Sequence, residues 1–116
     1  MEENNLLVIA QSHKIYLAVK YIDFRCGIDA LSAICRNKFY LDPFCGHYFI
    51  FRNRKASAIK ILIYHSAGFW LCHYRLSKGV LQFWPKHQDE TILINSNDLQ
   101  KLLQNINFSQ LTKYNE

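Results

Sequence analysis

A short apolar run between a turn and a cluster of positive charges most constrains the fold of this chain. Tyr48–Phe51 consists of aromatic and β-branched residues, which suits a buried strand. The run ends at Arg52-Asn53-Arg54-Lys55, and a second apolar run begins at Ala58. Because the chain must reverse over residues 52–57, the sequence predicts a β-hairpin whose tip is positively charged.

The segment in front of this hairpin is predicted to be a turn. It contains Asp42, Pro43 and Gly46. Proline presets one backbone angle, and glycine can take a positive φ. The aspartate side chain can accept hydrogen bonds from the backbone of its own loop. This turn is expected to lead the chain into the strand that begins at Tyr48.

Two segments show the spacing of amphipathic helices. In the first, Asp23 occupies an N-cap position, and apolar residues recur on one face through about Arg36. In the second, Ser96 is predicted to cap a helix that runs from Asn97 to about Asn105 and carries a leucine-rich stripe. Such stripes are typical of helices that pack on a core.

Short strands separated by turns account for most of the remaining chain. Further runs of strand-forming residues occur at 14–20, 58–65, 69–76, 80–83 and 91–94. This pattern predicts the α+β class, with an antiparallel meander sheet of about five strands and two flanking helices. We expect a single domain over residues 1–108 and a C-terminal tail over residues 109–116.

The positive charge is concentrated in the middle of the chain. Residues 14–87 contain twelve of the fourteen Lys and Arg residues but only three of the nine Asp and Glu residues. An excess of positive charge in one part of a chain favours a polyanionic partner. The sequence therefore points towards a partner such as nucleic acid.

Residues that carry catalytic chemistry are scarce. A metal-dependent nuclease needs several carboxylates that converge on divalent ions, and the central block contains only Asp23, Asp29 and Asp42. Cys45 and His47 could form a nucleophile pair, but no glycine-rich oxyanion loop accompanies them. No phosphate loop or dinucleotide motif occurs either. We therefore predict no enzyme activity and no cofactor.

The cysteines and the hydropathy indicate the compartment. Four cysteines, at positions 26, 35, 45 and 72, form no Cys-x-x-Cys pair. This usage predicts free, mostly buried thiols and no bound metal. No run of 18 apolar residues occurs, and the N-terminus is acidic rather than basic. We expect a cytoplasmic protein without a membrane partner.

Positive charges near the ends of the predicted hairpins are the candidate nucleic-acid contacts, namely Arg52, Arg54, Lys55, Lys60 and Arg75. Lys60 has two interpretations, because a mid-strand lysine on a half-apolar face can lie at a solvated edge or can face a ligand. The charged tip can also be a solvated turn whose charges prevent aggregation. Since basic patches also bind proteins, an interaction module remains the alternative to DNA binding.

Three blocks of residues occur in order along the chain. They are Asp23-x-Arg25-x-Gly27, then Asp42-Pro43-Phe44-x-Gly46-His47 leading into Phe51-Arg52-x-Arg54, and then Lys60-Ile61-Leu62 through Gly68-Phe69 to Trp84-Pro85. In their order and spacing, over about residues 14–108, the chain resembles the accessory protein of the IS-66 family of bacterial insertion sequences. The resemblance implies a small protein encoded beside a larger transposase that carries the acidic catalytic residues.

The resemblance also implies how such a protein works. It would support transposition without an assigned activity of its own, which agrees with the shortage of carboxylates. Its expected partners are the transposase of the same element and DNA. Arg25 lies at an unfavourable position at a helix start, which a pair with Asp23, Asp29 or a distant carboxylate, or contact with a ligand, would offset. Because the resemblance marks both Arg25 and Asp42, we expect Asp42 to be the partner. The hairpin is expected to present one continuous positive face, formed by Arg52, Arg54, Lys55 and Lys60.

Overall fold

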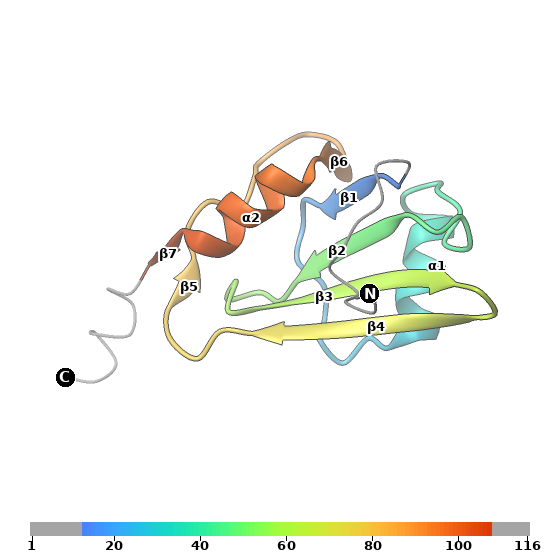
Figure 1. The fold of residues 1–116 in the computed structure, drawn as a ribbon, viewed down its shortest axis with the longest axis horizontal. Coiled ribbons are helices and arrows are strands. Elements are labelled where there is room, and N and C mark those ends of the chain that lie inside the picture. Colours follow the sequence, from blue (N-terminus) through green and yellow to red (C-terminus); the bar gives the residue numbers. More distant parts are fainter. Residues whose placement is uncertain (1–12, 108–116) are drawn as a thin grey trace, which may run out of the picture.

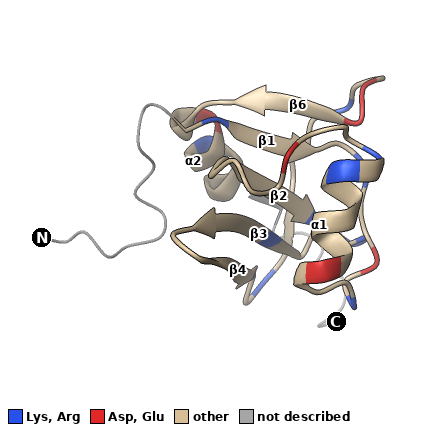
Figure 2. Cartoon of the chain, turned by 90° about the vertical axis from the view of Figure 1, so that its right-hand side faces the viewer, with Lys and Arg blue, Asp and Glu red and all other residues tan. Residues whose placement is uncertain are grey.

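In the computed structural model, which describes residues 13–107, a five-stranded sheet lies between two helices (Figures 1 and 2). The elements are, in chain order, β1 (Ile15–Ala18), α1 (Ile28–Asn37), β2 (Tyr48–Arg52), β3 (Ala58–His65), β4 (Gly68–Arg75), β5 (Val80–Leu81), β6 (Thr91–Ile94), α2 (Ser96–Gln104) and β7 (Ile106–Asn107). The predicted tail over 109–116 lies outside the described residues. The α+β class is confirmed.

The strand order of the large sheet is β4-β3-β2-β1-β6. Strands β2, β3 and β4 form an antiparallel meander, and β6 is antiparallel to β1. The prediction of a meander throughout is wrong at β1, which is parallel to β2. The reason is that the connection between them contains α1, and such a crossover returns the chain in the same direction. The two short strands β5 and β7 pair separately.

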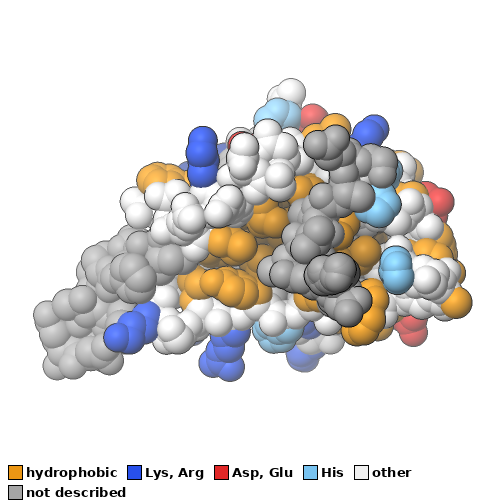
Figure 3. Space-filling model, viewed as in Figure 1, with side chains coloured by type: hydrophobic (Ala, Val, Ile, Leu, Met, Phe, Trp, Pro, Cys, Tyr) orange, Lys and Arg blue, Asp and Glu red, His pale blue; other side chains and the backbone are white. Residues whose placement is uncertain are grey.

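The side chains of β2 point alternately to the two faces of the sheet, and each face has a hydrophobic core. Phe49 and Phe51 point to the side covered by α1, where they pack with Leu31 and Cys35 of that helix. The neighbouring Tyr48 and Ile50 point to the side of α2, where the buried residues are Ile15, Leu17, Ile59, Ile61, Ile63, Leu81, Leu99 and Leu102. Figure 3 shows hydrophobic side chains visible on this second side, between α2 and β4. The sheet is therefore the centre of two small cores.

Both helices begin at residues other than those predicted. The N-cap of α1 is Gly27, and no side chain caps this helix. Asp23, the predicted N-cap, lies four residues before Gly27 and does not cap it. The N-cap of α2 is Asn95, whose side chain accepts a hydrogen bond from the backbone N of Asp98. The Asp98 carboxylate in turn accepts from the backbone N of Asn95, which completes a capping box. Ser96 is thus the first helical residue and not the cap.

Candidate nucleic-acid interface

The turn between β2 and β3 confirms the predicted hairpin, and Asn53 fixes its shape. The Asn53 Oδ1 accepts from the backbone N of Ser57 at 2.9 Å and of Ala58 at 3.2 Å, and Nδ2 donates to the Ser57 Oγ at 2.9 Å. Ala56 adopts φ +57°, an uncommon conformation for a residue with a side chain. The tip of the hairpin is therefore a hydrogen-bonded structure rather than a loose loop.

Exposed cations from two hairpins lie around this tip. Arg54 and Lys55 are exposed in the turn itself. Arg75, also exposed, pairs across the strands with Ala58, the first residue after the turn. The backbone N of Leu76 donates to the Ser57 carbonyl at 2.9 Å, which holds the end of β4 beside the turn. We call Arg54, Lys55 and Arg75 the basic tip.

Arg52 lies behind the basic tip, between two aromatic rings. Its guanidinium carbon is 5.8 Å from the centroid of Tyr21 and 5.7 Å from that of Trp84. Its Nη1 donates to the carbonyls of Asn53 and Arg54 at 3.2 and 3.1 Å. The Arg52 Nε is buried and has no partner among the described residues. Burial lowers the pKa of this guanidinium from its ordinary value.

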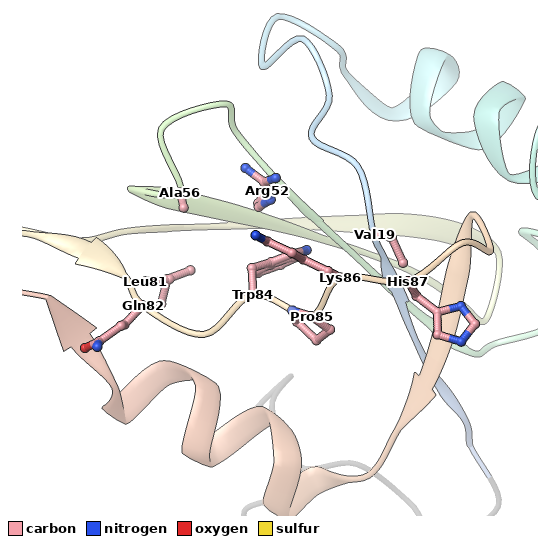
Figure 4. A pocket seen from close by; sticks show the side chains of 9 residues that line it. All are labelled: Val19, Arg52, Ala56, Leu81, Gln82, Trp84, Pro85, Lys86 and His87. Carbon is pink, nitrogen blue, oxygen red and sulfur yellow. The ribbon is translucent and has the colours of Figure 1, made fainter.

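Trp84 reaches Arg52 from a segment 32 residues further along the chain. Its Nε1 donates to the carbonyl of Ala18 at 2.9 Å, and the backbone N of Leu81 donates to the carbonyl of Ala56 at 2.7 Å. These bonds hold the segment after β5 against the hairpin and leave a pocket of about 400 Å³ between them (Figure 4). The pocket is lined by Val19, Arg52, Ala56, Leu81, Gln82, Trp84, Pro85, Lys86 and His87.

Lys60 does not belong to this surface. Arg52 pairs with Ile59 across the strands, so the two side chains lie on the same face of the sheet. Lys60 is the next residue after Ile59, and its side chain therefore points to the opposite face. It is 8% exposed, and its Nζ donates to the carbonyls of Phe24 and Cys26 at 2.7 Å each. The expected continuous positive face that includes Lys60 is therefore wrong, because both interpretations of this lysine assumed that its ammonium group was free.

Arg25 makes the expected ion pair, but with a different carboxylate. Its Nη2 lies 2.6 Å from the Asp23 Oδ2, and its backbone N donates to the Asp23 Oδ1. Asp42, the predicted partner, accepts from the backbone N of Phe44 instead. Two residues that are close in the chain form this pair at little entropic cost, so the local carboxylate wins over the distant one. Gly27, the third residue of this motif, ends the same loop as the N-cap of α1.

The second motif shapes the turn before β2, at the end of that strand away from the basic tip. Pro43 is fully buried, and the ring of Phe44 packs on those of Tyr64 and Phe69 at 5.0 and 5.2 Å. Gly46 adopts φ +87°, where a side chain would be strained. The His47 Nδ1 accepts from the backbone N of Lys14 at 3.0 Å, and burial lowers the pKa of this imidazole. These residues fix the backbone of the turn before β2.

The structure thus brings together only part of the predicted site. Arg52 contacts Trp84 and lines one pocket with Trp84 and Pro85. The exposed cations of the basic tip lie beside it, at the same end of the sheet. The motifs that contain Asp23 and Asp42 do not join them. The sequence did not predict Tyr21 and Lys86 as residues of this site. The position of Lys86, directly after the motif residues Trp84-Pro85, could have indicated it.

The Asp23–Arg25 pair gives a prediction for acid titration. Hydrogen bonds from the Arg25 side chain and backbone lower the Asp23 pKa to about 2. A lowered pKa means that the pair stabilises the fold above the ordinary aspartate range and loses this effect as the pH falls towards 2. NMR titration of the Asp23 carboxyl should give a midpoint near 2. In Arg25→Gln the midpoint should rise part of the way to the ordinary value, because the backbone N of residue 25 still donates to the carboxylate. An unchanged midpoint in the variant would contradict the pair.

Residues 13–107 include all four cysteines of the chain. Within this range no group of three His, Cys, Asp or Glu residues could hold a metal ion, and no helix is long and apolar enough to cross a membrane. The cysteines are free there: Cys35 is buried, Cys26 and Cys72 are half-buried, and Cys45 is exposed, contrary to the expectation of mostly buried thiols. Burial raises the pKa of Cys35 to about 12, which keeps it protonated.

Comparisons with known proteins agree with the motifs. The family model described as IS66 Orf2 like protein matches residues 13–113. The uncharacterized protein y4hO of Sinorhizobium fredii (strain NBRC 101917 / NGR234) is 29% identical over 103 residues, 89% of each chain. The uncharacterized protein y4jC of the same organism is 29% identical over 72 residues, 62% of each chain. No solved structure gives a significant match.

Proposed function

Because this chain belongs to the IS66 Orf2-like family, we propose that it is a non-catalytic accessory protein of bacterial DNA transposition that binds nucleic acid through its basic tip. The observation that carries the proposal is the placement of Arg54, Lys55 and Arg75. All three are exposed, and none has an ion-pair partner within residues 13–107. Unpaired cations at one end of a sheet suit the phosphates of a nucleic-acid backbone.

The geometry supports backbone contact rather than reading of bases. The tip is a short turn held by Asn53, and it presents side chains with charged ends. Each phosphate that such a cation neutralises releases counterions, so affinity falls with salt by about 0.9 log unit per log unit for each phosphate. Contacts of this kind hold a protein on DNA without a strong sequence preference.

The test is a triple variant, Arg54→Ala, Lys55→Ala and Arg75→Ala, with fluorescence anisotropy of DNA from the element ends over a salt series. We expect binding to weaken and the salt slope to become shallower by about two to three units. Thermal stability should change little, because exposed charges contribute little to folding. Salt-insensitive binding by the parent, or unchanged affinity in the variant, would reject the proposal.

A control variant with the same loss of charge distinguishes the effect of the basic tip from the effect of the net charge of the chain. Three other exposed cations lie away from the tip. Arg36 and Lys38 are at the C-terminal end of α1, and Lys14 lies beside Tyr48, at the other end of β2. The corresponding triple alanine variant removes the same charge. If both variants weaken binding equally, the basic tip is not the binding surface and only the net charge matters.

The edge strand β4 supports the alternative function, docking on the transposase. Trp70 and Tyr74 are 50% and 43% exposed. They pair across the strands with Ile63 and Ile59, so both lie on the same face of β4. Exposed aromatics on an edge strand are typical of protein contacts. If this alternative holds, Trp70→Ser should weaken co-purification with the transposase and leave DNA affinity unchanged.

A further inference from the structure

The pocket beside the basic tip contains two cations and no carboxylate. Its lining residues include Arg52 and Lys86 and no Asp or Glu. In Figure 4 the Lys86 side chain extends along Trp84 towards Arg52. Two positive groups that approach each other repel unless an anion lies between them. Within residues 13–107 neither has an ion-pair partner, so no described carboxylate neutralises them.

Arg52 is held in the orientation that an anion site requires. Its Nη1 donates to two backbone carbonyls, and its guanidinium carbon lies 5.8 and 5.7 Å from the ring centroids of Tyr21 and Trp84. The remaining donors include Nε, which is buried and unpartnered. Leaving a buried donor unpaired costs free energy, and an incoming acceptor would recover it. The side chain is therefore preorganised for a ligand and not only for packing.

We propose that this pocket binds one unpaired nucleotide of a nucleic-acid end, with its phosphate between Arg52 and Lys86 and its sugar and base against Trp84 and Pro85. This inference rests on the proposed function, of which it is a more specific form. A pocket of about 400 Å³ is within the size range of small-molecule sites. A base pair stacked inside a duplex cannot enter such a pocket, whereas an unpaired nucleotide can.

The walls of the pocket suit the two parts of a nucleotide. Arg and Lys are the side chains that bind phosphate, through charge-assisted hydrogen bonds. Trp84 and Pro85 supply apolar surface of the kind on which single-stranded bases pack.

The first experiment tests the pocket without DNA. Thymidine monophosphate is titrated into the labelled full chain, and the indole N–H signals of the two tryptophans are followed by NMR. We expect the Trp84 signal to move and the Trp70 signal to stay, with no shift from thymidine and a weaker one from inorganic phosphate. Lys86→Ala should weaken binding about tenfold, as loss of a charge-assisted bond does; Lys38→Ala should not.

Several results of this titration would overturn the proposal. These are no movement of the Trp84 signal, equal shifts from thymidine and its monophosphate, equal binding of inorganic phosphate, and an unaffected Lys86→Ala variant. Arg52→Lys keeps the charge but not the fork of donors, so it should also weaken binding. Because Lys86 is exposed, its replacement tests the pocket even if the Arg52 variant fails to fold.

The second experiment separates this inference from the proposed function. The parent should bind a duplex with a three-nucleotide single-stranded end about fivefold more tightly than the blunt duplex, and Lys86→Ala should lose this preference but keep blunt-duplex binding. Equal binding of both DNAs by the parent would reject the pocket and leave the proposed function intact. Binding of thymidine monophosphate without any DNA binding would reject the proposed function and leave the pocket.

Discussion

Replacing Lys60 with alanine is expected to destabilise the protein by about 2–4 kcal/mol, because the change removes one partner of a buried, charged hydrogen-bond network. The Lys60 Nζ donates to two carbonyls, those of Phe24 and Cys26, at 2.7 Å each. It also lies 4.6 Å from the centroid of the Phe24 ring. Within residues 13–107 no other side chain donates a hydrogen bond to these two carbonyls, so alanine at position 60 would leave both without a side-chain donor.

Urea unfolding followed by circular dichroism measures this loss, and two further variants identify its cause. Lys60→Met keeps most of the apolar stem but removes the donors, so it should lose nearly as much stability as alanine if the hydrogen bonds dominate. Lys55→Ala, at an exposed position in the basic tip, should change stability by less than about 0.5 kcal/mol. A loss below about 1 kcal/mol in Lys60→Ala would contradict the structural role.

The same variants decide whether Lys60 also contacts nucleic acid. Its ammonium group is held under the loop that leads to α1, on the side of the sheet opposite Arg52. Folded Lys60→Met should therefore bind DNA with the affinity and the salt slope of the parent. Reduced DNA affinity in a fully folded sample would restore this lysine to the binding surface.

Local patterns predicted the strands and the hairpin well, because strand composition and turn residues act over a few positions. The charged tip between Tyr48–Phe51 and Ala58–His65 is found as expected. The pairing of β1 could not be predicted in this way, since alternation along a strand does not specify its neighbour. The position of α1 between β1 and β2 was the available evidence for a parallel pair.

The candidate site depends on contacts between distant segments, which a single sequence does not reveal. Nothing in the local pattern indicates that Trp84 reaches the hairpin, or that the loop before α1 turns its carbonyls towards Lys60. The motif resemblance marked Trp84 and Arg52 without saying that they touch. The error on Asp23 is of another kind: its carboxylate satisfies Arg25 next to it, so the helix begins later, at a glycine.

Replacing Trp84 with alanine is expected to cost about 3 kcal/mol and to abolish ligand binding in the pocket. The indole packs against the core on the α2 side, and its Nε1 bonds to the carbonyl of Ala18, which is buried. It also forms one of the two aromatic walls around Arg52. The segment after Leu81 has no regular structure before β6, so this one side chain is a main attachment of that segment to the sheet.

The second tryptophan provides the matched control for this prediction. Trp70 is half exposed on the edge strand, so Trp70→Ala removes the same side chain from a position with far less burial and should cost less than about 1.5 kcal/mol. Trp84→Phe keeps an aromatic wall but removes the indole N–H, and leaving the Ala18 carbonyl unpaired should cost about 1–2 kcal/mol. Urea unfolding measures all three variants. Equal losses at positions 84 and 70, or no loss in Trp84→Phe, would show that the indole is not the attachment that holds the pocket together.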